Sequence, residues 1–98
     1  MEIKKDQYYI VRAARAGLFF GKIKEIHPGS VTMTDVRKLW YWDGAAAAEQ
    51  IALDGVSAPE NCKFTVTVRE MEIMEPIQVI PCTSKATDII RKVREWKR

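Results

Sequence analysis

Turn signals divide the first half of this 98-residue chain into runs that favour β-strands, and they constrain the fold more than any other feature. Residues 8–15 and 18–26 are rich in β-branched and aromatic side chains and are separated by a small-residue pair. Residues 27–30 (HPGS) place Pro and Gly at the central positions of a type II turn. A third strand is expected over 31–33, with a fourth, or a bent continuation of it, over 36–42. Antiparallel strands joined by such tight turns form a meander.

The middle of the chain carries a helix signal followed by strand signals. Four alanines begin a predicted helix over residues 45–53, with Asp43 as its candidate N-cap and Gly55 at its C-terminal end. Residues 63–69 alternate apolar and polar side chains, which predicts a half-buried strand that continues in phase to Ile73. Prolines bound a further short run at 76–80, which is therefore expected at a sheet edge.

The last segment predicts a second helix. Thr83 or Ser84 is its expected cap, and its apolar residues recur at helical spacing up to Trp96. We expect this helix to cross an open end of the sheet, with Trp96 filling that end. The predicted fold class is therefore α+β: a small, strongly bent antiparallel sheet of about five to six strands, SH3-like or a half-open barrel, with two short helices.

Size and charge limit the kinds of function. Ninety-eight residues are expected to form a single domain, 1–98, and a core of this size gains stability from homo-oligomerisation. The net charge of +3 comes from interspersed acids and bases, which makes nucleic acid a less expected partner. No apolar run approaches membrane-spanning length, so no membrane partner and a cytoplasmic location are expected. Cys62 and Cys82 are then expected to be free thiols.

The sequence offers no pattern typical of a catalyst. The single histidine, His27, falls in a predicted turn that supplies neither a pocket nor an orienting partner. Cys62 lies at a predicted strand entrance, where a buried thiol is inert. The glycines at 17 and 21 lack the Gly-Lys-Ser/Thr ending of a phosphate loop, and one histidine cannot complete a zinc site. We expect no enzymatic activity, no metal and no cofactor.

Residues 36–44 (VRKLWYWDG) are the strongest candidate for a binding function. They contain two of the three tryptophans, a tyrosine and adjacent Arg and Lys residues. Aromatic faces beside cations suit a flat anionic partner such as a nucleotide. The same residue types also suit core packing or a subunit interface. Because a core of this size is not expected to bury both faces of the strand, all three interpretations remain open.

Further cations are predicted on the neighbouring strands of the meander. Strand pairing would bring two or three of Arg12, Arg15, Lys22 and Lys24 together as an anion-binding rim, although a solvated face with interleaved acids explains them too. The predicted ligand-binding set is Arg12, Arg15, Arg37, Lys38, Trp40, Tyr41 and Trp42. In it the aromatic rings stack on a base and the cations hold phosphate.

Several stretches of the chain give it a resemblance to a known family. They lie at residues 9–12 and 15–21, at 37–45 (RKLWYWDGA), at 59–65 (PENCKFT), at 80–83 (IPCT) and at Glu95-Trp96. In these stretches the chain resembles a small family of phage and prophage proteins of unassigned function. The resemblance brings no assigned catalytic or binding residues.

The phage setting implied by the resemblance suggests a function by analogy only. Small non-enzymatic phage proteins act against host defence, and a phage-encoded protein would work in the host cytoplasm. The leading hypothesis is a homo-oligomeric, sponge-like protein that sequesters a nucleotide-derived signalling ligand. The alternatives are a protein-binding inhibitor of a host defence or nuclease complex, and an accessory protein that binds single-stranded nucleic acid.

Overall fold

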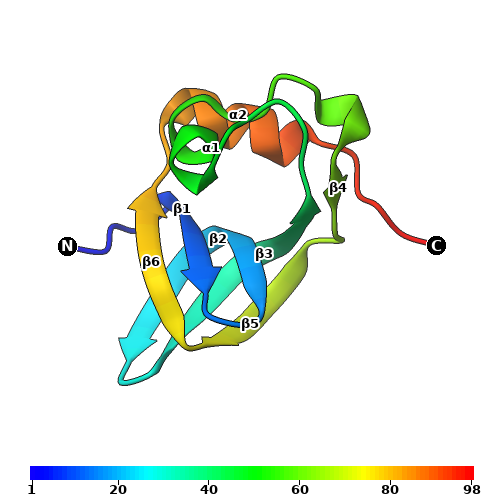
Figure 1. Cartoon of the computed structure of the whole chain (residues 1–98). Coiled ribbons are helices and arrows are strands. Elements are labelled where there is room, and N and C mark those ends of the chain that lie inside the picture. The colour runs from blue at the N-terminus through cyan, green and yellow to red at the C-terminus, as the bar shows by residue number, and fades with distance from the viewer.

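The computed structural model describes all residues from Met1 to Arg98 (Figure 1). Six strands form one bent antiparallel sheet, and two short α-helices lie together over one end of it (Figure 1). The elements in chain order are β1 (Tyr8–Ala13), β2 (Gly17–His27), β3 (Ser30–Tyr41), α1 (Ala48–Asp54), the 3₁₀ turn η1 (Pro59–Asn61), β4 (Lys63–Phe64), β5 (Val68–Met74), β6 (Pro76–Pro81) and α2 (Ser84–Lys92). Neither helix is long and apolar enough to cross a bilayer.

The sheet is an open one, in the order β4-β3-β2-β1-β6, with β5 also paired to β3. The three-strand meander and both of its turns are confirmed, since β1 pairs with β2 and β2 with β3 in antiparallel register. Glu75, at a φ of 56°, turns the chain directly from β5 into β6. β5 and β6 therefore form one continuous ribbon in which β5 pairs with β3 and β6 pairs with β1, and this curls the sheet. The predicted α+β class is confirmed.

Both faces of the meander are buried, because the sheet separates two apolar clusters. Tyr8 and Ile10 point to the side of the helices, whereas Tyr9 and Val11 point into the concave side closed by β5. Burial of both faces explains why β1 has a continuous apolar sequence instead of alternating apolar and polar residues. Arg12 follows Tyr8 and Ile10 on the helix side, which directs it toward α1.

The aromatic segment belongs to one long strand instead of two. β3 runs unbroken from Ser30 to Tyr41, so the bent continuation was the correct alternative. The bend falls at Asp35, whose φ is 48° and which is skipped in the pairing of β3 with both neighbours. An inserted residue of this kind locally increases strand twist, and it redirects the segment that carries Trp40 toward the helices.

The prediction of one continuous strand over residues 63–69 was wrong, because the chain forms two separate strands there. β4 has only two residues, and 65–67 leave the ladder before β5 begins at Val68. Hydrogen bonds outside the regular ladder, two of them to side chains, satisfy backbone polar groups in this segment and in β3. Thr65 bonds Lys38 through both its N–H and its hydroxyl, and Thr67 donates its N–H to the Glu95 carboxylate. Val66 is consequently exposed rather than inward-facing.

Two helix boundaries also differ from the sequence prediction. α1 begins at Ala48 after Ala47, without a side-chain cap, and Asp43 instead accepts a hydrogen bond from the Asn61 amide. Gly55 does end α1, as predicted. Thr83 caps α2 through the Ala86 N–H, but the helix stops at Lys92. Trp96 therefore lies beyond the helix.

Candidate ligand-binding pocket

A pocket of about 570 Å³ lies where the β1–β2 turn, the end of β3 and the start of α1 meet. Five of the seven predicted binding residues line it: Arg12, Arg15, Lys38, Trp40 and Trp42. The lining residues come from three separate segments of the chain, 12–18, 38–42 and 47–49, so only the fold brings them together. The rest of the lining is mainly small, with alanines from the turn and from α1.

The cations of the pocket are placed by the hairpin and by β3. Arg12 stands opposite Leu18 in the β1–β2 ladder and is exposed, and Arg15 lies in the turn. Lys38 reaches across Gly17, where a Cβ would sit 3.1 Å from the lysine Cε. Gly17 also has a φ of 109°, so the tight turn and the close approach both need glycine there. The absence of a side chain at Gly17 thus leaves room for Lys38 beside the turn.

Two of these cations form no ion pair. No carboxylate lies within 4.0 Å of Arg12 or Lys38, whereas Arg15 Nε lies 3.7 Å from Glu75 Oε1 in a largely exposed pair. Exposed pairs of that kind contribute little. All three cations therefore remain available to an anion.

The two tryptophans of the pocket have different surroundings. Trp42 is half-buried and packs against the cluster beneath the helices. Trp40 is 53% exposed and stacks on Trp96, with ring centroids 4.9 Å apart. The Lys63 ammonium lies 5.3 Å from the Trp40 ring centroid, which adds a cation–π contact. The C-terminal segment thus holds Trp40 in place while half of its surface stays open.

One acidic residue of the pocket was missed from the sequence. Glu49, in the first turn of α1, lines the same pocket as the three cations and accepts a 3.0 Å hydrogen bond from Gln78 Nε2 of β6. The pKa of its carboxyl is lowered, first by its own backbone N–H, then by Gln78 and by the charge of Arg12. An acid in the first turn of an alanine-rich helix looks like an ordinary dipole partner, so no local signal identifies it.

Arg37 was predicted to bind a ligand, but it is buried and has a structural role. Its side chain is 3% exposed, and its guanidinium donates to four backbone carbonyl oxygens: those of Phe64 (3.1 Å), Thr65 (3.0 Å), Ile90 (3.2 Å) and Val93 (2.8 Å). Burial lowers its pKa. The carbonyls of the last turn of α2 carry partial negative charge, which favours a cation there. Arg37 ties α2 to β3 and β4 and is not available to a ligand.

Tyr41 also lies outside the pocket. It ends β3 opposite Lys63 and is 50% exposed. The predicted cations Lys22 and Lys24 are likewise elsewhere, since they pair with Asp35 and Glu70 respectively. The pocket rim thus contains Arg12 and Arg15 from the predicted set of four.

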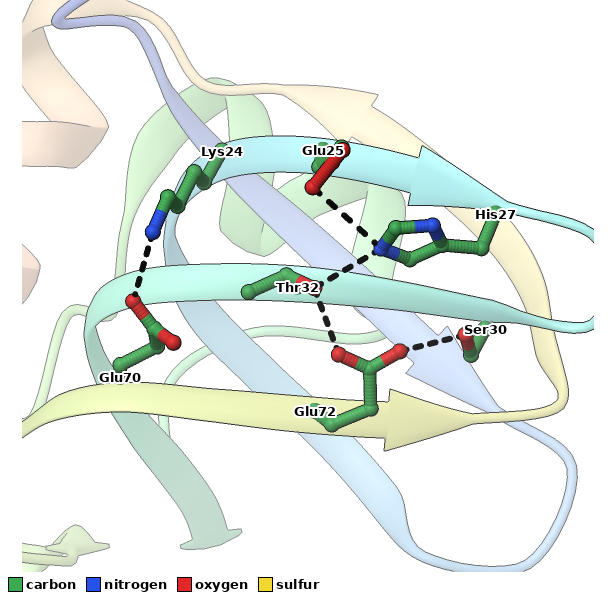
Figure 2. A network of polar contacts seen from close by, with 7 residues as sticks. All are labelled: Lys24, Glu25, His27, Ser30, Thr32, Glu70 and Glu72. Atoms are coloured by element: carbon green, nitrogen blue, oxygen red, sulfur yellow. Dashed lines mark hydrogen bonds and ion pairs between the residues drawn. The ribbon is translucent and has the colours of Figure 1, made fainter.

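His27 belongs to a polar network at the opposite end of the β2–β3 hairpin (Figure 2). Its Nε2 lies 3.2 Å from the Thr32 hydroxyl, which donates to Glu72, and Ser30 donates to the other Glu72 oxygen. Because the Thr32 hydroxyl has one proton and gives it to Glu72, its oxygen accepts from the His27 N–H. In this arrangement His27 cannot take a proton from Thr32.

The remaining nucleophiles and metal-ligand types show no site geometry. Both cysteines are free and buried, and burial raises the pKa of Cys62 and raises that of Cys82 to about 12. Such thiols are poor nucleophiles. No three His, Cys, Asp or Glu side chains gather closely enough to hold a metal ion.

The fold and the pocket together define a small α+β protein with an open six-stranded antiparallel sheet. The chain belongs to the family described as a domain of unknown function (DUF6948), whose model matches residues 6–90. That span includes every pocket residue. No curated protein and no solved structure matches the chain.

Proposed function

We propose that the protein binds a small, anionic, nucleotide-type ligand in the pocket between the β1–β2 turn, β3 and α1, and does not turn it over. The observation that carries this proposal is the convergence of Arg12, Arg15 and Lys38 with Trp40 and Trp42 on one pocket. Arg12 and Lys38 have no ion-pair partner, and Trp40 keeps half of its surface open.

The size and chemistry of the pocket suit this class of ligand. Sites for small molecules typically enclose about 300–1,000 Å³ and combine apolar walls with a few polar groups. A volume of about 570 Å³ falls within that range. In the proposed complex the base stacks on the exposed surface of Trp40, and Arg12 and Lys38 bind phosphate oxygens, with Arg15 as an outer cation.

The biological setting extends the proposal. The resemblance to phage and prophage proteins suggests a counter-defence factor that sequesters a nucleotide-derived signal of the host. A sponge of this kind works as a homo-oligomer, and the exposed apolar side chains Tyr41 and Ile77 offer contact surface for further copies. Light scattering on the purified protein tests the homo-oligomer separately. A monomeric mass would contradict the proposed oligomer but not the proposed ligand pocket.

The pocket proposal is tested on the purified protein in two ways. Denaturation followed by mass spectrometry identifies any nucleotide that was carried through purification. Thermal unfolding with added nucleoside diphosphates or cyclic oligonucleotides should raise Tm by about 10 °C at 100 times Kd, since that saturation adds ~2.7 kcal/mol. No released nucleotide and no shift above about 1 °C would contradict the proposal.

A specific observation favours one alternative, a protein-binding inhibitor. Tyr41 and Val66 are exposed near the β3–β4 edge and lie outside the pocket, beside half-exposed Trp40. Exposed aromatic residues of this kind are enriched in protein interfaces. A Tyr41→Ala variant that loses a host partner in pull-down while keeping nucleotide binding would support it. Single-stranded nucleic acid, the third possibility, would show steep loss of affinity with salt.

A further inference from the structure

We propose that Glu49 selects the base of the bound nucleotide and that the preferred base is guanine. This inference rests on the proposed nucleotide function and deepens it. Its starting point is the charge pattern of the pocket, which is lined by one carboxylate and three cations. A pocket that recognised phosphate alone would lose affinity by placing Glu49 there, because like charges repel.

The Glu49 side chain is exposed, and Gln78 orients its carboxylate by donating to Oε2 at 3.0 Å. The charge of Arg12 favours the ionised form. Gln78 is itself positioned by β6, where it stands opposite Arg12 in the β1–β6 ladder. Glu49 is therefore an exposed acceptor whose carboxylate is oriented by a side chain from β6.

The number of open acceptor positions suggests what it recognises. An ionised carboxylate offers about four lone-pair positions, and Gln78 takes one of them. The remaining positions can accept two donors from a ligand. Guanine presents two adjacent donors, N1–H and the N2 amino group, which a carboxylate accepts together. Adenine and cytosine place an acceptor nitrogen beside their single amino group, and uracil places carbonyls on both sides of N3–H.

The arrangement of the pocket walls agrees with this assignment. Glu49 comes from α1, whereas Arg12 belongs to β1, Arg15 to the hairpin turn and Lys38 to β3. The acceptor and the three cations thus come from different elements, with Trp40 and Trp42 also in the lining. In the proposed complex a nucleotide stacked on Trp40 directs its base edge to α1 and its phosphates to the cations of the β1–β2 hairpin and β3.

Isothermal titration of GDP, IDP and ADP tests the assignment, because IDP differs from GDP only by lacking the N2 amino group. The wild-type protein should bind GDP at least about tenfold more tightly than IDP or ADP, as expected for loss of a paired donor. Glu49→Gln should reduce the GDP-to-IDP ratio to less than about twofold and leave ADP affinity within about threefold. Glu2→Gln removes the same charge at an exposed position outside the pocket and should change nothing.

A second variant addresses the positioning of Glu49. Gln78→Met removes the donor to Glu49 together with Gln78 Oε1, a buried atom that has no hydrogen-bond partner. The fold should therefore be retained, and the GDP-to-IDP ratio should fall without loss of ADP binding.

The outcomes separate the inference from the function on which it rests. Equal affinity of the wild-type protein for all three nucleotides overturns the role of Glu49 while the nucleotide function stands. Equal loss of all three in Glu49→Gln would mean that Glu49 only supports Arg12, which also overturns it. Absence of binding by any nucleotide overturns both.

Discussion

The indole rings of Trp40 and Trp96 stack with their centroids 4.9 Å apart and their planes inclined by 22°. These residues lie at the end of β3 and in the segment after α2, so the contact joins distant parts of the chain. The backbone N–H of Trp96 also donates to the Phe64 carbonyl, which fixes the segment against β4. Trp96 therefore supports the wall of the pocket although it does not line it.

The first prediction concerns this support. Trp96→Ala should weaken nucleotide binding about three- to tenfold, because an aromatic pair contributes about 0.5–1.5 kcal/mol to holding Trp40 in place. The substitution keeps the backbone bond to Phe64. Titration with a nucleoside diphosphate measures the affinity, and circular dichroism checks for loss of the signal from stacked indoles.

Lys97→Ala is the matched control, since Lys97 is the exposed neighbour in the same segment. It should bind like the wild type. Unchanged affinity in Trp96→Ala, together with loss of the stacked-indole signal, would show that Trp40 needs no support from Trp96.

The second prediction concerns Arg37. Arg37→Met should destabilise the fold by about 3 kcal/mol or more, since it leaves up to four buried carbonyl groups without their donor. Urea unfolding measures the free energy of unfolding. Lys38→Met is a closely matched control, because Lys38 is the adjacent cation and has no ion-pair partner, and it should change stability by less than about 0.5 kcal/mol. Equal effects of the two substitutions would contradict the structural role of Arg37.

The third prediction concerns pH and Glu72. Hydrogen bonds from Ser30 and then Thr32 lower the pKa of Glu72 below its usual value of 4.5. A carboxyl with a depressed pKa in the folded state stabilises above its unfolded pKa, and this contribution is lost as pH falls through the folded pKa. The Tm of the wild-type protein should therefore exceed that of Glu72→Gln at neutral pH, and the difference should shrink below pH 4.5.

The neighbouring glutamate supplies the control for that experiment. Glu70 lies on the same strand and bonds Lys24 rather than two hydroxyl groups. Glu70→Gln should keep most of the Tm of the wild type at neutral pH, because exposed ion pairs contribute little. A Glu72→Gln difference that stays constant down to pH 3 would contradict the role of the two hydroxyl donors.

Much of the fold could be predicted because its signals are local. The turn at Pro28 and Gly29, the Gly55 helix end and the Thr83 cap each depend on a few adjacent residues. The break after Phe64 could not be predicted, because the alternating pattern of residues 63–69 is a good strand pattern. Bonds from distant side chains, such as Glu95 to the Thr67 N–H, satisfy the backbone outside the ladder.

The sequence predicted which types of residue line the candidate site better than it predicted the individual residues. The aromatic and cationic composition of β3 pointed to Lys38 and Trp40, and both line the pocket. The same composition included Arg37, because nothing local distinguishes a cation that faces solvent from one that faces the carbonyl end of a helix 53 to 56 residues later. Glu49 was missed for the complementary reason, since its meaning depends on Arg12 and Gln78 from other strands.

The affinity of the purified protein for a nucleoside diphosphate, measured by titration calorimetry in wild-type and cation-depleted forms, tests the central claim most directly. The wild-type protein should bind one of the common nucleoside diphosphates. The double variant Arg12→Ala/Lys38→Ala should lose about 100-fold or more, since each charge-assisted contact contributes about 1.5–3 kcal/mol. Lys5→Ala/Lys97→Ala, which removes the same charge at exposed positions outside the pocket, should retain wild-type affinity. Equal affinities in all three proteins, or no binding by the wild type, would contradict the account.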